Sequence, residues 1–231
     1  EQTDWIADNA DNVAFVSHLG DIVQDWDDTD QWAVADAAMS LLDDVTPYGM
    51  VLGNHDYPAQ TPEKFDQELF NTYFPLSRFE AQPWWGGGYP EGTNTNSFQT
   101  FSAGGMEFLS LHLQFEPPPE ARAWASGVIA DHPGHRVLIS THSHLGPDGE
   151  WWVQPSYDPG ETTWADLIAP YDNVFMVLSA HVDGEASRTT ALDDRVVHEL
   201  LACYQSRQYG GGGMMRLLEF HPTDNRIDVI S

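Results

Sequence analysis

Four apolar runs in this chain each stop at a polar side chain, and this pattern constrains the fold more than any other feature. The runs at residues 15–20, 51–53, 137–141 and 177–180 are followed at once by, respectively, Asp21, Asn54, His142 and His181. A buried strand that ends in this way presents the polar residue at its carboxyl tip, and in open α/β sheets ligands gather at those tips. We therefore expect the four side chains to converge at one edge of a sheet.

Apolar periodicity predicts helices and strands that alternate first and are followed by strands alone. Residues 30–42 have a helical period with Asp30 placed as the cap, and residues 97–101 and 106–113 predict a hairpin. Further helices are predicted at 2–9, 62–73, 120–130 and 162–168, and further strands at 13–17, 48–52, 136–140, 174–179, 186–190, 196–201, 215–220 and 227–230. Residues 75–97 and 146–160 are predicted to be long loops. This order predicts an α/β protein, a mixed β-sandwich flanked by helices, with residues 1–231 forming one domain.

The charge of the chain indicates the setting in which it folds. Aspartate and glutamate total 36 against 9 lysines and arginines, so the net charge is −27. Self-repulsion destabilises such a compact state, and about 1 M salt removes most of it because the Debye length falls to roughly 3 Å. The 41% hydrophobic content and nine tryptophans argue against disorder. We expect a halophilic protein in a high-salt environment, with no nucleic-acid partner because no basic face exists to neutralise phosphates.

Three features of the sequence bear on where the protein is located in or outside the cell. The sequence has no run of eighteen apolar residues, which predicts no membrane partner. Cys203 is the single cysteine and lies in an apolar run, which favours a core residue over a reactive thiol. The chain opens at Glu1 rather than at methionine, and we expect a processed or truncated N-terminus. Between compartments, we favour a secreted or periplasmic location over the cytoplasm.

Two short motifs and two histidines follow one another in a fixed order. They are Gly20-Asp21 with Asp25 four residues after Asp21, then Gly53-Asn54-His55-Asp56, then His142, then His181. This series resembles the calcineurin-like metallophosphoesterase superfamily, and the resemblance extends over nearly the whole chain. It implies a four-layer αββα fold and hydrolysis of small phosphate esters, monoesters or diesters, by a metal-bound hydroxide.

The resemblance also implies roles for individual residues. Asp21 matches a carboxylate that bridges two metals, while Asn54, His142 and His181 match ligands of the second metal. His55 matches the residue that assists at the phosphate or leaving group, with Asp56 orienting its ring. Asp25 is a weaker ligand or lies in the second sphere. Amide oxygen, carboxylate and imidazole suit Mn²⁺, Zn²⁺ or iron, whereas an all-oxygen cage would suit Ca²⁺ or Mg²⁺.

The chain departs from the family pattern at two places. No strand before residues 13–17 supplies the Asp-x-His of the first metal site, and Asp183 stands where the family has its last histidine. We therefore expect one firmly held divalent metal and a weak second site to which Asp183 contributes. A fold that lacks the first strand exposes a sheet edge. We expect a homo-oligomer, another partner chain or a rearranged N-terminus to cover it.

Each motif has a structural alternative. Taken alone, Asp21 caps a helix, residues 54–56 form a polar turn, and His142 and His181 are hydrogen-bonded core histidines; only their joint order favours a metal site. Four other histidines are predicted to be structural: His18, His112, His135 and His144. Two other functions stay open, a degenerate relative that binds one metal or a ligand without turnover, and a metal-water enzyme that acts on a non-phosphate substrate.

Overall fold

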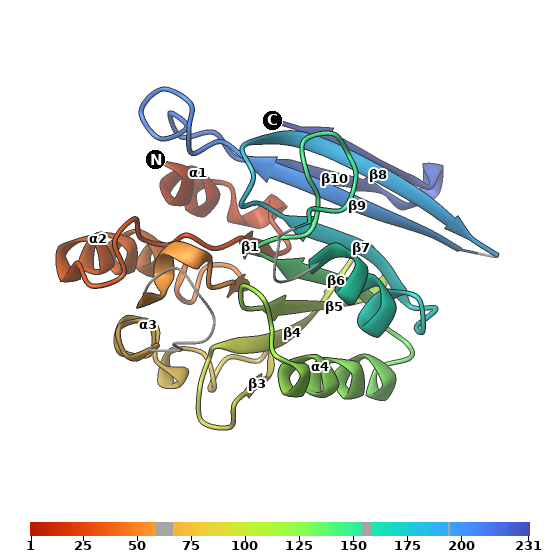
Figure 1. Cartoon of the computed structure of the whole chain (residues 1–231), viewed down its shortest axis with the longest axis horizontal. Helices are drawn as coiled ribbons and strands as arrows, with labels where there is room; N and C mark the ends of the chain where they lie inside the picture. The colour runs from red at the N-terminus through yellow and green to blue at the C-terminus, as the bar shows by residue number, and fades with distance from the viewer. Residues whose placement is uncertain (59–66, 154–158, 194) are drawn as a thin grey trace.

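The computed structural model describes residues 1–58, 67–153, 159–193 and 195–231 (Figure 1). Its helices are α1 Gln2–Asp8, α2 Thr29–Met39, α3 Glu68–Tyr73, α4 Pro119–Asp131 and α5 Pro159–Thr163, the last continuing into the π-turn η7 Trp164–Ile168. Its strands are β1 Val16–His18, β2 Tyr48–Met50, β3 Trp85–Tyr89, β4 Asn96–Ala103, β5 Met106–Leu113, β6 Arg136–Thr141, β7 Val174–Ser179, β8 Gly184–Leu192, β9 Arg195–Cys203, β10 Leu217–His221 and β11 Arg226–Ile230.

A mixed seven-stranded sheet organises the described chain. Its strand order is β3-β4-β5-β6-β7-β9-β8. The central strands β5, β6, β7 and β9 are parallel, and β3, β4 and β8 flank them in antiparallel pairs. Because β6 and β7 are parallel neighbours, the residues that follow Thr141 and Ser179 emerge at the same edge. His142 and His181 are among those residues.

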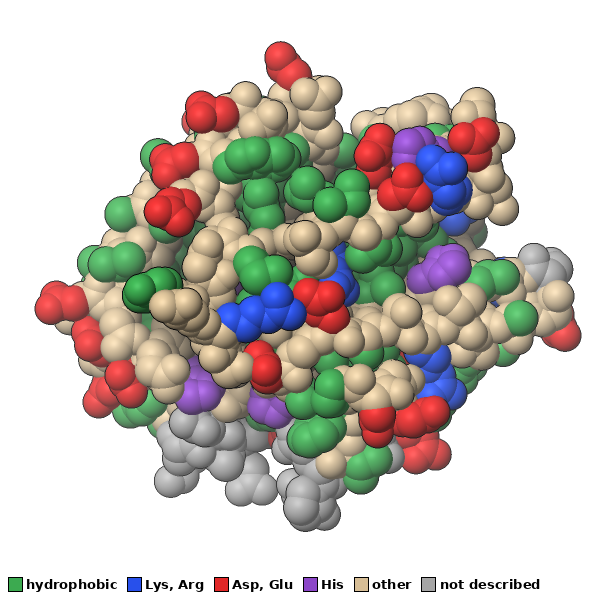
Figure 2. All heavy atoms as spheres, turned by 90° about the horizontal axis from the view of Figure 1, so that it is seen from above, with side chains coloured by type: hydrophobic (Ala, Val, Ile, Leu, Met, Phe, Trp, Pro, Cys, Tyr) green, Lys and Arg blue, Asp and Glu red, His purple; other side chains and the backbone are tan. Residues whose placement is uncertain are grey.

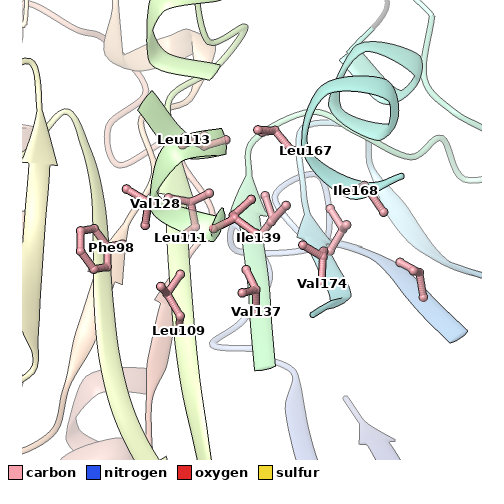
Figure 3. Close-up of a cluster of buried hydrophobic side chains, with 14 residues drawn as sticks. Phe98, Leu109, Leu111, Leu113, Val128, Val137, Ile139, Leu167, Ile168 and Val174 are labelled. Carbon is pink, nitrogen blue, oxygen red and sulfur yellow. The ribbon is translucent and has the colours of Figure 1, made fainter. Parts of the chain in front are cut away.

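Helices cover one face of this sheet. Alternate residues of β5 and β6, including Leu109, Leu111 and Ile139, are fully buried on this face. They pack against α4 and η7, which contribute Val128 and Leu167 (Figure 3). Burial of these aliphatic side chains holds the parallel strands in register and so keeps their carboxyl ends level.

Two small sheets cover the opposite face. The β10–β11 hairpin packs Leu218 and Phe220 against Phe108 of β5 and Phe175 of β7. The parallel pair β1–β2 lies over a more polar part of β5, where Ser17 Oγ is 3.3 Å from His112 Nε2. Helices and small sheets on opposite faces make this a mixed α/β sandwich, and the predicted fold class is confirmed.

Three local predictions differ from the structure. β3 lies inside the predicted loop 75–97, where pairing with β4 makes a strand of a glycine-rich stretch. Helix α2 is capped by Asp28 rather than Asp30, because the Asp28 carboxylate accepts hydrogen bonds from the amides of Asp30 and Gln31. Of the predicted helix 62–73, residues 62–66 lie outside the described residues, and α3 begins at Glu68. None of the helices in the described ranges is both long and apolar enough to span a bilayer.

Candidate metal centre

The side chains of Asp21, Asn54, His142 and His181 form a connected cluster. Asn54 Oδ1 lies 2.9 Å from His181 Nδ1 and 3.1 Å from His142 Nε2, and His142 Nε2 lies 3.3 Å from Asp21 Oδ1. Ligand atoms at about 2.1 Å from one ion, at angles between tetrahedral and octahedral values, are roughly 3.0–3.4 Å apart. The three separations are close to those of adjacent ligands on one ion, with Asn54 and His142 as the shared members.

The amide of Asn54 is what joins the two imidazoles. If only His, Cys, Asp and Glu are considered, the described residues contain no group of three that could hold a metal ion. Asn54 is 8% exposed, and His142 is 1% exposed. A binding site here therefore depends on a buried neutral amide oxygen as a central donor.

Two glycines let the strand tips approach each other this closely. Gly20 has φ +94°, and a Cβ there would lie 2.5 Å from His142 Nδ1. A Cβ on Gly53 would lie 2.2 Å from Asp21 Oδ1 and 2.8 Å from His142 Cε1. All three distances are far inside van der Waals contact, so the cluster requires glycine at both positions.

Two of the four polar residues have left-handed backbone conformations. Asp21 has φ +50° and His181 has φ +64°. Such conformations cost energy in residues other than glycine and concentrate at functional sites. They turn each side chain from its strand into the cluster.

A hydrogen bond from Nδ1 of His142 fixes the tautomer of its neutral ring. Nδ1 lies 2.7 Å from the carbonyl oxygen of Leu19, which can only accept, so Nδ1 carries the proton. In the neutral ring, Nε2 then presents a lone pair toward two oxygens, those of Asn54 and Asp21. Metal-binding histidines use this arrangement, in which one nitrogen donates to a backbone carbonyl and the other faces the ion. The donor set therefore fits a divalent cation.

Electrostatics within the cluster favour an ionised carboxylate beside neutral imidazole. Burial opposes ionisation of Asp21, but the neighbouring His142 side chain and the backbone amide of His55, which donates a hydrogen bond of 3.1 Å to the carboxylate, outweigh it and lower the pKa of Asp21. Burial, reinforced by the charge of His142, lowers the pKa of His181 to about 4. Both shifts give the protonation states in which these side chains bind cations.

His55 and Asp56 flank the cluster, but they do not form the expected contact with each other. The prediction that Asp56 orients the His55 ring is wrong, because the Asp56 carboxylate accepts hydrogen bonds from the amides of Gly53 (2.7 Å) and Val23 (3.0 Å). Asp56 is 3% exposed, and burial raises its pKa to about 7. His55 Nδ1 instead lies 3.0 Å from the carbonyl oxygen of Gln24, which leaves its Nε2 as the nitrogen available to a ligand.

The two weaker candidates lie outside the four-residue cluster. Asp25 is exposed, and its carboxylate accepts a hydrogen bond from Gln31 Nε2 at 2.9 Å. Asp183 is also exposed, two residues beyond His181. Neither is among the side chains that meet at Asn54.

Sequence reasoning missed two buried groups, Phe115 beside the cluster and Glu199 on β9. Phe115 is 3% exposed and places its ring 5.7 Å from the His142 ring and 5.3 Å from the His181 ring. Glu199 is fully buried and lies 2.7 Å from His144 Nε2. The signal for Glu199 was present, since it is a lone carboxylate inside the apolar run at residues 196–201.

Comparison with known proteins places the chain in a family. The profile of the calcineurin-like phosphoesterases matches residues 2–183. The chain is 34% identical over 240 residues to the uncharacterized protein YvnB of Bacillus subtilis (strain 168), covering 99% of this chain but 18% of that protein's length.

Two solved structures share the fold. One is the purple acid phosphatase PPD1 from seeds of yellow lupin (Lupinus luteus), with a TM-score of 0.54 and 16% identity over 96% of this chain and 40% of the lupin chain. The other is a dimetal phosphatase from Danio rerio, with a TM-score of 0.52 and 17% identity over 86% of this chain and 76% of the fish chain. Together with the profile match, the shared architecture and the ordered motifs identify the chain as a member of the calcineurin-like phosphoesterase family.

Proposed function

We propose that this protein hydrolyses phosphate esters with a divalent transition metal, Mn²⁺, Zn²⁺ or iron, held by Asp21, Asn54, His142 and His181. The observation that carries the proposal is the separation of 2.9–3.1 Å between Asn54 Oδ1 and the two imidazole nitrogens. Membership of the calcineurin-like phosphoesterase family supports both the reaction class and the use of divalent metal.

The proposal assigns a role in hydrolysis to the bound ion and to three residues around the cluster. A bound divalent ion would supply charge stabilisation at a phosphoryl oxygen and activate water at neutral pH. His55, with Nδ1 facing the carbonyl of Gln24, leaves Nε2 to face the leaving-group oxygen, and the doubly protonated ring would donate its Nε2 proton there and return to the neutral form. The Asp56 carboxylate holds the tips at Gly53 and Val23 together and so keeps Asn54 in place. Phe115 closes the inner side of the cluster against water.

We propose one firmly held metal and a weaker neighbouring site. The exposed positions of Asp25 and Asp183, away from the four-residue cluster, support this asymmetry. The same observation favours a second candidate function, a family member that binds one metal without turnover.

One experiment separates the two candidates. Bound metal is measured by elemental analysis, and turnover of p-nitrophenyl phosphate and bis-p-nitrophenyl phosphate is followed in about 1 M salt for wild type and Asn54→Ala. We expect turnover by wild type and loss of both metal and turnover in Asn54→Ala. Turnover that survives this substitution would remove the cluster from the mechanism, and bound metal without turnover would favour the second candidate.

We further propose a halophilic setting, outside the cytoplasm, and a second copy of the chain as partner. Figure 2 shows acidic side chains dispersed over one whole face, with the few basic ones beside them. Among the described strands, β1 pairs with β2 alone and β10 with β11 alone, so each small sheet has edges that a second copy can cover. Sedimentation in high salt tests the oligomer, and a monomer at all concentrations contradicts it.

A further inference from the structure

Two adjacent tryptophans beside the metal centre have different environments. The Trp151 ring packs 5.5 Å from the Trp164 ring, and its Nε1 donates a hydrogen bond of 2.8 Å to Glu199. The Trp152 ring instead lies 6.4 Å from the His181 ring in an edge-on arrangement of 67°. Trp151 therefore points into the protein, and Trp152 points to the candidate metal centre.

Glu199 anchors the segment that carries both tryptophans. Its carboxylate is fully buried and receives His144 Nε2 at 2.7 Å, Trp151 Nε1 at 2.8 Å and Arg188 Nε at 3.5 Å. Arg188 also stacks over the Trp151 ring at 4.7 Å. A buried carboxylate with hydrogen bonds to two residues of this segment and an ion pair to β8 is costly to disturb, so it fixes the segment firmly.

Short backbone contacts transmit this anchoring to Trp152. The Trp152 amide donates to the His144 carbonyl at 2.9 Å, and Leu145 bridges to Trp151. A Cβ on Gly160 would lie 2.4 Å from Trp151 Cβ, so helix α5 packs directly on the anchor. With His144 and Trp151 both held by Glu199, the half-buried indole of Trp152 has little freedom beside His181.

We propose that Trp152 determines specificity by presenting an aromatic face to phosphate esters with an aryl leaving group, and that Glu199 is a positioning residue that holds it there. This inference rests on the proposed function. An indole whose ring lies 6.4 Å from an imidazole of the candidate metal centre offers a planar apolar surface beside the site. The net charge of −27 disfavours leaving groups that carry further negative charge, whereas a neutral ring meets no such repulsion.

The first test compares turnover of p-nitrophenyl phosphate and glycerol 2-phosphate. Taking the variant-to-wild-type ratio of kcat/KM for each substrate cancels the intrinsic reactivity of its leaving group. We expect Trp152→Ala to lower the ratio about threefold to tenfold for the aryl ester only, with Trp152→Phe retaining most of the activity. Trp5→Ala, which removes an exposed tryptophan of α1, is the matched control and leaves both ratios at one. Equal losses on both substrates would overturn the inference.

The second test uses binding and so stands apart from catalysis. Dissociation constants of phenylphosphonate and methylphosphonate, which are not hydrolysed, are measured with the Mn²⁺-loaded protein. We expect wild type to prefer phenylphosphonate and both Trp152→Ala and Glu199→Gln to reduce that preference at least threefold, with methylphosphonate affinity unchanged. Equal binding of the two ligands by wild type refutes the role of Trp152. A preference for phenylphosphonate without turnover of any ester would refute the proposed function and support the aromatic site.

Discussion

The Nε2 atom of His142 and the Oδ1 atom of Asn54 lie 3.1 Å apart, and in the neutral ring neither atom carries a hydrogen to share. Nδ1 of His142 is committed to the Leu19 carbonyl, so the ring cannot change tautomer to relieve this contact without losing that bond. A cation between the two atoms converts the repulsion of facing lone pairs into attraction.

Metal should therefore stabilise the fold through this pair. At a free Mn²⁺ concentration about 100 times its Kd, linkage adds about 2.7 kcal/mol, which raises the melting temperature of a domain of this size by roughly 5–10 °C. We expect this shift for wild type in thermal melts with Mn²⁺ against EDTA, and its loss in His142→Gln. His135→Gln, a histidine outside the cluster, keeps the full shift; if it loses the shift as well, the stabilisation comes from elsewhere.

Gly53→Ala tests how closely the strand tips must approach. The added Cβ would meet Asp21 Oδ1 at 2.2 Å and so displaces a proposed ligand. We expect loss of metal binding and at least a hundredfold loss of turnover, on the order of 3 kcal/mol of transition-state stabilisation. Gly127→Ala in α4, where a Cβ meets nothing within 4 Å, is the matched control and stabilises the protein by about 0.5–1 kcal/mol. Normal metal affinity in Gly53→Ala would contradict the close approach.

His112 makes the fold sensitive to acid. It is fully buried, and burial, followed by the charge of His18, lowers its pKa to about 3. Below pH 6.5 the unfolded chain binds a proton at this residue that the folded chain does not, so stability falls as pH falls from about 6.5 to 3. At pH 4.5 this amounts to about 3 kcal/mol, at 1.36 kcal/mol for each pH unit.

Urea unfolding of wild type and His112→Gln at pH 7.5 and pH 4.5, in EDTA and constant high salt, measures this effect. Between pH 7.5 and pH 4.5 the unfolding free energy of wild type should fall more than that of His112→Gln. A difference that stays constant with pH would show that His112 titrates alike in both states.

Salt should stabilise the protein through its excess of acidic side chains. With a net charge of −27, screening between about 0.1 and 1 M KCl shortens the Debye length from roughly 10 to 3 Å and weakens self-repulsion. We expect the unfolding free energy to rise over this range, and to rise less when the exposed Asp8 and Asp11 are both changed to Asn. An identical salt dependence in wild type and the double variant would assign the effect to something other than charge.

The sequence predicted the polar strand tips because each is a local pattern, an apolar run that ends at Asp21, Asn54, His142 or His181. His142 and His181 come together because β6 and β7 are parallel neighbours, and Asp21 and Asn54 because β1 and β2 are. The expected single sheet edge is wrong, because the two pairs belong to different sheets that meet only through tertiary packing. The partner of Glu199 could not be predicted in this way, since His144 reaches it only through the tertiary pairing of β6, β7 and β9.

Two misses have different physical origins. Gly86, Gly87 and Gly88 indicate a turn by composition, and only the ladder with β4 makes them a strand. The sequence around residues 27–30 offers three aspartates as possible caps of α2. Asp28 is the cap because the capping residue directly precedes the first helical turn, which begins at Thr29.

The left-handed backbones of Asp21 and His181 also limit how this site can evolve. An exchange to a β-branched residue at either position would lose a donor and in addition strain the chain by roughly 1–2 kcal/mol, whereas asparagine or glycine tolerates the conformation. Random mutagenesis that selects for a changed metal preference should therefore recover Asn at position 21 far more often than Thr or Val.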